Sequence, residues 1–417
     1  MLDIQFIRDN PDKVKKAAKD KGLNPEVVDR VLELDKKRRE LLVEVEELRA
    51  ERNKLTKEDI KKGREIKKKL KDLEPQLRKI EGDYKKTMLQ IPSVAAKEVP
   101  VGKDEKDNKL VRKWGKLPKF SFKAKDHIEL GESLDLLDLE RGVKVAGFRG
   151  YFLKNEAVLM QLGLMQYALE KLISKGFKAM IPPTLVKRET LFNTGHFPWG
   201  EMDIYKTFND EKEEDKRYLA GTAEVPLVSY HSGEILNEKD LPILYAGFSP
   251  CYRREIGSYG KDTRGIYRIH EFLKIEQVVI CKNDMKESEE WLEKLAVYAE
   301  EILKELKLPY RVMMMCTGDM GEPQIKKYDI EAWMPSRKGY GEIMSDSMMG
   351  DFQARRANIK YKNKKGGVKY VHMLNNTAIA SPRTLIAIWE NYQQKDGSVR
   401  VPEVLQKYVG KKVIKPI

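Results

Sequence analysis

The sequence contains few cysteines and no obvious metal-ligand cluster. Only three cysteines occur among 417 residues, Cys251, Cys281 and Cys316, and none belongs to a CxxC pair. An odd number of scattered cysteines predicts a reducing compartment without disulfide bonds. The five histidines are isolated from one another along the chain. We therefore expect no structural zinc.

Long hydrophobic runs and nucleotide-binding loops of the common kinds are also missing. No run of 18 apolar residues occurs, and the first residues, MLDIQFIRDNPDK, lack the apolar core of a signal peptide. These absences predict a soluble, cytoplasmic protein without a membrane partner. The chain has neither GxxxxGK[ST] nor a GxGxxG that follows a predicted strand, which excludes a P-loop and a Rossmann site.

Charge is abundant and unbalanced. Lysine and arginine total 80 against 66 acidic residues, for a net charge of +14. Such an excess favours an acidic partner, and nucleic acid is the leading candidate. A high content of lysine and glutamate is also typical of heat-adapted proteins, so part of the charge has a second explanation. The length allows two or three domains.

The first hundred residues predict a two-helix arm. Hydrophobic positions step by four and three from Val27 to Leu55 and again from Ile66 to Tyr84, which indicates two heptad helices, about 26–56 and 64–91, joined by a turn. Pro75 falls inside the second helix and should kink it. A coiled coil most often serves as a dimerisation or spacer device. The basic outer faces favour the alternative, a grip on a phosphate backbone.

The rest of the chain predicts a linker and a larger α+β domain. Residues 101–125 are rich in Lys, Gly and Pro and are expected to link residues 1–100 to a domain over 126–417. In that domain strands outnumber helices after residue 180 and do not alternate with them, which predicts an antiparallel sheet flanked by helices. The elements expected there are helices over 156–175 and 287–306, strands over 177–183, 310–316, 327–334, 341–345 and 351–361, and a polar mobile loop over 192–216.

The stretch from Phe248 to Glu276 predicts a hairpin with a long tip holding Gly257, Gly260, Lys261 and Arg264. Because successive side chains of a strand point to opposite faces, its two strands should line one floor. That floor suits a ligand with an anionic group, a planar ring and an ammonium group. The alternative is a solvated outer face. The residues expected on the floor are Arg253, Glu255, Arg268, Phe272 and Glu276, and Lys274 falls on the same face of the second strand.

Two further positions carry both an ordinary and a functional interpretation. Thr222 and Glu224 stand where a helix cap and a first-turn acid are expected, which explains them without a ligand. Arg383 opens a predicted helix, where a cation is unfavourable against the helix dipole. Either that arginine is solvated or an anion lies beside it.

Several motifs in order resemble one family. GFKAMIPPTL is similar to motif 1 of class II aminoacyl-tRNA synthetases, with Pro183 as its proline. CYRREIGSYGKDTRGIYRIHEFLKIE is similar to motif 2, and AIASPRTLIAIWENYQ to motif 3. The TAE of residues 222–224 resembles the serine-specific signature, and the heptad pair resembles a tRNA-binding arm. The whole chain thus resembles the bacterial type of seryl-tRNA synthetase.

The resemblance implies roles for individual residues. Arg253, Arg383 and Glu342 would be the catalytic groups, with Arg253 on the α-phosphate and Arg383 on the γ-phosphate. Glu342 and Ser345 would hold Mg²⁺ through ATP. The residues implied to bind ATP are Arg253, Arg254, Glu255, Ile269, Phe272, Glu342, Ile343, Met344, Ser345 and Arg383. Those implied to bind serine are Thr222, Ala223, Glu224, Arg253, Glu276, Asn375 and Thr377.

The resemblance also implies an activity and partners. The chain would activate L-serine with ATP to seryl-adenylate and pass serine to the 3′ end of tRNA(Ser), with tRNA(Sec) left open as a second acceptor. A homodimer is implied, in which the arm of one subunit reaches a tRNA whose acceptor end enters the other subunit's site. Two alternatives remain at this point: a ligase that loads a carrier protein, and a homologue without catalysis that serves as a binding or structural protein.

Overall fold

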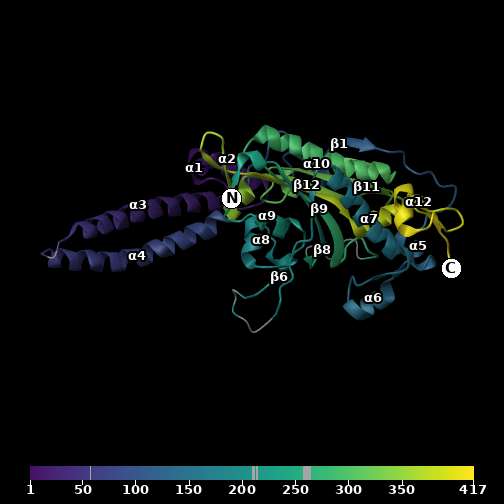
Figure 1. Cartoon of the computed structure of the whole chain (residues 1–417), viewed down its shortest axis with the longest axis horizontal. Coiled ribbons are helices and arrows are strands. Elements are labelled where there is room, and N and C mark those ends of the chain that lie inside the picture. Colours follow the sequence, from purple (N-terminus) through teal and green to yellow (C-terminus); the bar gives the residue numbers. More distant parts are fainter. Residues whose placement is uncertain (57, 209–211, 213–214, 257–263) are drawn as a thin grey trace. The chain divides into compact units, whose positions relative to one another are not determined.

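The computed structural model describes residues 1–56, 58–208, 212, 215–256 and 264–417 (Figure 1). The chain forms two compact units, Met1–Val94 and Ala95–Ile417. Gly257, Gly260 and Lys261, expected at the tip of the hairpin, lie outside the described residues. Within the described part, no helix combines the length and the apolar character that crossing a bilayer requires.

The smaller unit is helical and contains the predicted two-helix arm, which runs as two antiparallel helices side by side in Figure 1. Val45 on one helix packs with Ile66, Leu70 and Leu77 on the other, as the heptad pattern predicts. The second helix continues through Pro75. The helices are α1 (Ile4–Asp9), α2 (Pro11–Asp20), α3 (Glu26–Lys54) and α4 (Ile60–Met88).

A buried carboxylate ties the base of the arm together. Asp35 on α3 is 1% exposed and pairs with Arg8 of α1 at 2.6 Å, and with Arg38 and Arg39 of its own helix at 3.2 Å each. Three guanidinium groups compensate the charge that burial would otherwise make costly. Beside them Val28, Val31, Met88 and Ile91 form a separate apolar cluster. The base of the arm therefore has its own core, independent of the apolar contacts further out.

The larger unit is organised around an eight-stranded sheet, as the predicted α+β class requires. Every neighbouring pair is antiparallel except β4 and β8, which are parallel. The strand that stops before Pro182 lies at the edge of the sheet, as expected for a strand next to proline. In order across the sheet the strands are β1 (Lys109–Trp114), β10 (Tyr310–Met314), β11 (Lys326–Met334), β12 (Gly339–Gly350), β15 (His372–Ala380), β9 (Glu271–Cys281), β8 (Ile243–Tyr252) and β4 (Lys178–Met180).

Smaller sheets and helices complete this unit. The short strands are β2 (Leu137–Asp138), β3 (Phe152–Leu153), β5 (Leu185–Val186), β6 (Tyr218–Leu219), β7 (Ile235–Asn237), β13 (Lys360–Lys362), β14 (Val368–Tyr370), β16 (Val399–Arg400) and β17 (Val413–Ile414). The helices are α5 (His127–Ser133), α6 (Leu139–Ala146), α7 (Glu156–Ser174), α8 (Arg188–Thr194), α9 (Glu224–Ser229), α10 (Met285–Glu305), α11 (Phe352–Ala357), α12 (Ser381–Tyr392) and α13 (Gln406–Val409).

The two faces of the sheet carry different helices. On β9, Ile275 and Val279 belong to the large core that includes residues of α7, α10 and α12. Val278 and Ile280 instead pack with residues of α9 and α11. Because side chains alternate along a strand, these two sets lie on opposite faces. Glu276 and Thr377 therefore point away from α10, and Gln277 and Asn376 point toward it.

Three local expectations are corrected by the structure. The second strand of the hairpin begins at Glu271, because the preceding residues turn and pack against α5, where the backbone amide of Ile266 lies 3.3 Å from His127 Nε2. Residues 352–357, expected as part of a strand, form α11, which suits their alanine, glutamine and arginine content. The described part of 192–216 is packed, with Phe197 and Ile204 buried.

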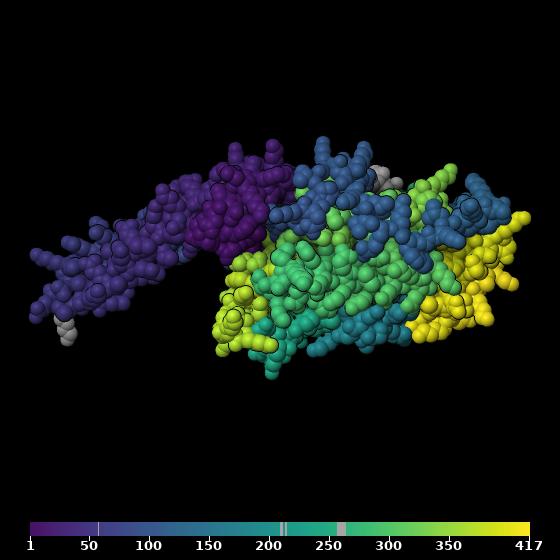
Figure 2. Space-filling view, turned by 90° about the horizontal axis from the view of Figure 1, so that it is seen from above, coloured from purple at the N-terminus to yellow at the C-terminus, as the bar shows by residue number. Residues whose placement is uncertain are grey.

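The segment expected to be a linker contributes to the sheet. Residues 109–114 form β1, which pairs with β10 at the edge of the sheet. Arg112 of β1 lies 2.5 Å from Glu300 of α10 and 3.2 Å from Glu293. Figure 2 looks onto this side of the unit, with α10 in green and the residues around β1 in blue.

A row of buried polar side chains crosses the sheet beneath α10. Gln277, Asn376, Asp346 and Tyr328 are direct neighbours on β9, β15, β12 and β11. The two amides both donate to the carbonyl of Leu295 on α10, at 3.4 and 2.8 Å. Both carboxyl oxygens of Asp346 are buried without a hydrogen-bond partner in the described structure. Burial, together with Glu293 and Glu276, raises the pKa of Asp346 well above its usual range, against the opposing effect of Arg112.

We expect Asp346→Asn to stabilise the larger unit at high pH. A carboxyl whose pKa is raised on folding binds its proton more tightly in the folded state, so stability falls as the pH rises above the unfolded value. The variant should exceed the parent by at least about 1 kcal/mol at pH 8 and lose this advantage near pH 4. All five tryptophans lie after residue 94, so tryptophan fluorescence during urea unfolding reports this unit. The exposed Asp240→Asn is the control, and equal stability of variant and parent at both pH values would contradict the expectation.

Candidate functional site

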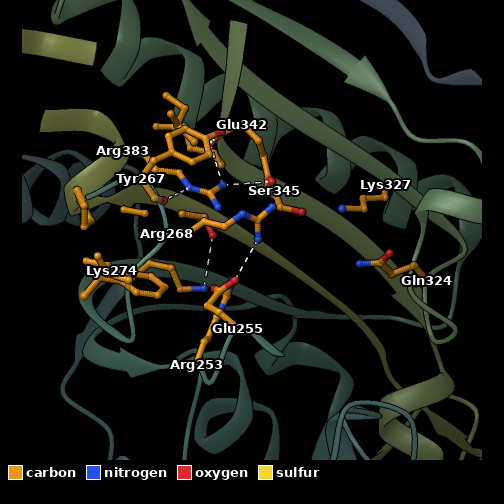
Figure 3. Close-up of a pocket in the computed structure, with 17 residues that line it drawn as sticks. Arg253, Glu255, Tyr267, Arg268, Lys274, Gln324, Lys327, Glu342, Ser345 and Arg383 are labelled. Carbon is orange, nitrogen blue, oxygen red and sulfur yellow. Dashed lines mark hydrogen bonds and ion pairs between the residues drawn. The ribbon is translucent and has the colours of Figure 1, made fainter. Parts of the chain in front are cut away.

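A cavity of about 230 Å³ opens on the face of the sheet opposite α10 (Figure 3). Its wall is made by residues of β9, β11, β12 and β15, by the start of α12 and by the segments that follow β8 and precede β9. In Figure 3 Arg383, Tyr267 and Glu342 lie together on one side, while Lys327 and Gln324 point in from the other. The predicted residues on its wall are Arg253, Glu255, Arg268, Ile269, Phe272, Glu342, Ile343, Met344, Ser345, Thr377 and Arg383.

The two predicted catalytic arginines face this cavity and are held in place from behind. Arg253 donates from Nε to the carbonyl of Gly221 at 3.3 Å, and its guanidinium lies 5.3 Å from the ring centroid of Phe272. Arg383 donates to the carbonyls of Tyr267 and Glu342 at 3.1 and 2.9 Å. Backbone acceptors fix both side chains while leaving part of each fork of N–H donors for an anion.

Four of the five residues predicted for the floor of the hairpin line the cavity, namely Arg253, Glu255, Arg268 and Phe272, and an ion pair lies among them. Phe272 contributes the ring, and Glu255 pairs with Arg268 at 3.0 Å and with the buried Arg149 at 3.8 Å. Glu255 has a positive φ of 54°, a conformation that a side chain rarely adopts. The bend after β8 thus turns the Glu255 carboxylate toward the arginines, and strain of this kind is typical of functional sites.

A second acidic cluster lies across the cavity. Glu342 and Ser345 are on β12 and both face the cavity, with a Glu342 carboxylate oxygen 3.2 Å from Arg383 Nη1. Burial alone would raise the pKa of Glu342, but Arg383, Lys327 and Arg253 hold it below its usual value. On β11, burial raises the pKa of Asp329 to about 7, although Lys327, 3.1 Å away, opposes the shift.

The deepest part of the site is a buried ion pair. Lys274 and Glu276 stand two residues apart on β9, so both point to the same face, and their side chains form a salt bridge while 5% and 3% exposed. Lys274 Nζ also donates to Thr222 Oγ1 at 2.7 Å, and Thr377 Oγ1 donates to Glu276 at 3.3 Å. Burial raises the pKa of Glu276, and Lys274 opposes that shift. Thr377 is the register partner of Glu276 on β15.

The residues of the TAE stretch form a buried network next to this pair. Glu224 is the first residue of α9, and its carboxylate accepts from Gln353 Nε2 at 2.7 Å and from Asn375 Nδ2 at 3.0 Å. Burial raises the pKa of Glu224, against the hydrogen bond from Gln353 and the charge of Lys274. Thr222 Oγ1 accepts from the Glu224 amide at 3.2 Å, as the capping interpretation requires, and it also contacts Lys274.

The structure separates six of the predicted residues from the cavity wall, namely Thr222, Ala223, Glu224, Arg254, Glu276 and Asn375. Arg254 is exposed and donates to the carbonyl of Met202 at 3.1 Å, away from the cavity. Glu276 lies one layer below the wall, and its partners Lys274 and Thr377 line the wall itself. Ala223 is buried against Leu227 rather than lining the cavity.

Sequence reasoning assigned no role to Lys274 or Lys327. Lys274 was predicted on the functional face of the hairpin, two residues before Glu276, and that spacing was the available signal. Lys327 precedes Asp329 by two residues on a predicted strand, which places both on one face. No local pattern indicated which face of β11 meets the cavity.

Comparison with known proteins finds relatives that match the chain over its whole length. Residues 1–95 match the family model described as seryl-tRNA synthetase N-terminal domain, and residues 205–392 match tRNA synthetase class II core domain (G, H, P, S and T). The chain is 43% identical to a serine–tRNA ligase of Dictyoglomus turgidum over 430 residues, covering 100% of both chains. It is 44% identical to a serine–tRNA ligase of Deinococcus radiodurans, covering 98% of each.

Solved structures agree with this placement. The seryl-tRNA synthetase of Pyrococcus horikoshii complexed with ATP superposes with a TM-score of 0.93 at 41% identity, covering 100% of both chains. The cytoplasmic serine–tRNA ligase of Naegleria fowleri in complex with AMP gives a TM-score of 0.90 at 34% identity and covers 100% of this chain and 99% of that one.

We expect Lys274→Met to destabilise the larger unit by about 3–5 kcal/mol at pH 7.5, because it leaves the buried Glu276 carboxylate without its cation. The deficit should shrink toward pH 5, where Glu276 can accept a proton and become neutral. Urea unfolding followed by tryptophan fluorescence measures both effects.

The double variant Lys274→Met/Glu276→Gln provides the control for this pair. Removing the charge of the second partner should restore part of the lost stability, since the two effects are coupled. Additive losses, or a single variant as stable as the parent, would mean that the pair does not organise the site.

Proposed function

Because the chain belongs to the seryl-tRNA synthetases of class II, we propose that the cavity holds ATP on its arginine-lined side and L-serine at the Lys274–Glu276 end. The chain is a serine–tRNA ligase, an enzyme that joins serine to tRNA at the expense of ATP. The observation that carries this assignment of the cavity is the meeting of two anchored arginines with a buried ammonium–carboxylate pair on one face of the sheet.

ATP is proposed to bind between the two arginines. Phe272 offers a flat ring for the adenine, with Ile269 beside it, and Glu255 accepts hydrogen bonds from the adenine edge. Arg253 holds the α-phosphate and Arg383, at the start of α12, holds the γ-phosphate. The hydrogen bonds that the two arginines donate to the carbonyls of Gly221 and Tyr267 orient the guanidinium groups before the nucleotide binds. These hydrogen bonds therefore set where the phosphates are held.

Mg²⁺ is proposed to bind with the nucleotide at Glu342 and Ser345. Both offer hard oxygen ligands on the same cavity wall, which suits Mg²⁺. The surrounding cations hold the pKa of Glu342 down, so its carboxylate stays charged at neutral pH. When bound, the ion would neutralise part of the triphosphate charge, while Arg253 and Arg383 hold the chain of phosphates in line.

Serine is proposed to bind above the buried pair. Glu276 accepts from its ammonium and hydroxyl groups, and Thr377 contacts the hydroxyl. Glu224 and Thr222 close the side of this pocket, with Asn375 holding Glu224 and Ala223 filling the space behind. A site whose polar groups form hydrogen bonds with the serine hydroxyl rejects alanine, because those groups would be left without a hydrogen-bond partner. Threonine is excluded by its extra methyl group.

The first step needs no proton acceptor from the protein. The serine carboxylate is already ionised, attacks the α-phosphate, and releases pyrophosphate. The protein's contribution is alignment of the attacking and leaving oxygens and stabilisation of the developing charge by Arg253 and Arg383. The second step, transfer to the ribose of tRNA, does require that a hydroxyl lose its proton.

tRNA is proposed to bind partly through the two-helix arm. The outer faces of α4 carry exposed lysines, among them Lys67, Lys68, Lys69 and Lys71. The seam between the helices is closed by apolar residues, so these charges face outward for a phosphate backbone. A ligase that loads a carrier protein would have no use for such an arm.

A homodimer is proposed through the edge of the sheet at β4. Beyond that strand Ile181 is 80% exposed, and Leu162 on α7 and Leu185 on β5 are half exposed. Apolar side chains gathered at a sheet edge are typical of an interface. We propose that in this dimer the arm of one subunit serves the active site of the other.

We expect Glu276→Ala to lower serine-dependent ATP–pyrophosphate exchange by at least about 100-fold, because two hydrogen bonds to a charged acceptor are lost. The measurement is kcat/KM for serine in the exchange assay, with the exposed Glu289→Ala on α10 as the control. Exchange close to that of the parent would remove Glu276 from the serine site. No exchange by the parent chain would refute the proposed use of the cavity.

Removal of residues 40–80 should separate adenylate formation from tRNA charging. The deletion spares the core at the base of the arm, so exchange should stay within about twofold while charging collapses. A second test keeps the full chain and replaces four lysines with glutamine: Lys67, Lys68, Lys69 and Lys71. When the logarithm of the tRNA affinity is plotted against the logarithm of the salt concentration, the slope of this variant should be shallower. We expect a reduction of about one for each phosphate that a lysine no longer neutralises. A variant with unchanged charging and slope would show that the arm does not hold tRNA.

A further inference from the structure

His196 lies in a second cavity that adjoins the first. This cavity has a volume of about 330 Å³ and shares Arg253, Glu255, Arg268, Glu342 and Arg383 with the first. His196 belongs to the wall that only the second cavity has, together with residues near Gly200 and Ile204. The two cavities are therefore two parts of one cleft, and Arg253 lines both the part that holds His196 and the part proposed for the nucleotide.

The backbone around His196 is fixed. Helix α8 ends at Gly195, whose φ of 92° permits a turn that other residues rarely adopt, and an added Cβ there would lie 2.5 Å from Pro323. The His196 carbonyl accepts from the Gly200 amide at 2.7 Å, and the Thr194 carbonyl accepts from Gln353 at 3.0 Å. Gln353 also holds Glu224, so the segment is tied to the proposed serine pocket.

The hydrogen bonds of Thr194 determine which nitrogen of His196 is basic. Thr194 Oγ1 donates its single hydrogen to backbone carbonyls of α8, at 3.2 Å from that of Leu191. The same oxygen lies 2.8 Å from His196 Nδ1, and with the hydroxyl hydrogen assigned to a carbonyl we assign Nδ1 as the donor in that contact. Nε2 then carries the lone pair. Within the described residues no hydrogen bond engages Nε2, and the ring is on the cavity wall.

The carboxylates of this cavity are committed elsewhere. Glu255 pairs with Arg268, and Glu342 pairs with Arg383. Asp203 accepts from the Ile256 amide at 3.2 Å. Deeper in the site, Glu276 is held by Lys274 and Thr377. Among the carboxylates and the imidazole that line this cavity in the described part of the chain, the neutral imidazole is therefore the base that remains.

Resting on the proposed function, we propose that His196 is a catalytic residue of the transfer step, where Nε2 accepts the proton of the attacking ribose hydroxyl. The ribose oxygen forms a bond to the carbonyl carbon of seryl-adenylate, and the bond from that carbon to the phosphate oxygen of AMP breaks. The hydroxyl proton passes to Nε2, AMP leaves with the electron pair of the broken bond, and the imidazolium later returns its proton to solvent. Thr194 is a positioning residue that holds the tautomer.

Charge in the site favours this role once the adenylate has formed. Burial lowers the pKa of His196 to about 4, with Arg253 and Lys274 adding to the effect and Glu276 and Asp203 opposing it. An adenylate phosphate on Arg253 compensates one of those cations and raises the pKa of His196 toward its ordinary value. The imidazole thus becomes a stronger base when the substrate of the second step is present.

The test separates the two chemical steps. In His196→Gln the transfer of serine from preformed seryl-adenylate to tRNA, measured in a single turnover, should fall by about 100-fold or more, because general-base catalysis contributes about that much. ATP–pyrophosphate exchange should stay within about threefold, since the first step needs no base. His231→Gln, whose ring bonds to Glu234 and Tyr245 outside the cavity, is the matched control.

The pH profile distinguishes a base from a structural histidine. In the parent, transfer should fall as the pH drops through the His196 pKa of the adenylate complex, because only the neutral ring accepts a proton. The glutamine variant should lose that fall. Thr194→Val should slow transfer without affecting exchange, and Thr194→Ser, which keeps the hydroxyl, should restore the parental rate.

Three results would overturn the proposal. Transfer within threefold of the parent in His196→Gln would mean that another group, such as the adenylate phosphate, accepts the proton. Equal losses of exchange and transfer would show that the His196 ring has only a structural role in the cavity wall. If that variant does not fold, parental transfer rates in Thr194→Val would refute the tautomer argument. Failure of the parent in the exchange assay itself would instead refute the proposed function.

Discussion

Lys274 and Glu276 stand two residues apart on β9, so their side chains point to the same face of the sheet and meet where water is excluded. A pair of opposite charges at such a depth is stable only when each partner is compensated by the other and by hydrogen bonds. Thr222 and Thr377 supply these bonds from a turn and from the neighbouring strand. The pair therefore fixes how β9, β15 and the start of α9 come together, and the polar end of the cavity depends on that arrangement.

The antiparallel register extends this constraint across the sheet. Alternation on β9 sends Glu276 to the cavity and Gln277 to α10, and the same alternation on β15 separates Thr377 from Asn376. One face becomes a ligand floor and the other a helix-covered core that includes the buried row ending at Tyr328. Asp346 is the unfavourable member of that row, because its oxygens face α10 without a donor among the described residues. The proposed ligand site and the unfavourably buried Asp346 thus lie on opposite faces of the same sheet.

The arrangement of charges also divides the work between the two chemical steps. Arg253 and Arg383 are anchored by backbone carbonyls, and in the proposed function they hold the triphosphate, so that adenylate formation would depend on positioning. His196 lines the second part of the cleft together with Arg253, and in our proposal it accepts the proton of the acceptor hydroxyl once the adenylate has formed. Arg253, one of five residues that line both parts of the cleft, would border both proposed reactions.

Local sequence determined the elements whose signal repeats over many residues. The heptad spacing was sufficient for the two-helix arm, because apolar side chains at that period can be buried only against another helix. Period-two alternation placed Arg253, Phe272 and Glu276 on one face of a hairpin, and the likeness to class II motifs named the family. Arg383 at a helix start was already unfavourable unless an anion lay nearby, and the structure does place it on the cavity wall.

What only the tertiary structure decided were contacts between segments far apart in the chain. Sequence predicted Lys274 on the functional face, but its partners Thr222 and Thr377 come from positions about 50 and 100 residues away. Residues 352–357 became α11 because Gln353 and Phe352 are buried against distant groups, and the start of the second hairpin strand was displaced by packing on His127. His196 gained a defined tautomer only when Thr194 and the end of α8 were in place. A local sequence pattern predicts on which face of a strand or helix a side chain lies. Whether that side chain is buried, and with which residue it pairs, depends on the distant segments that pack against that face.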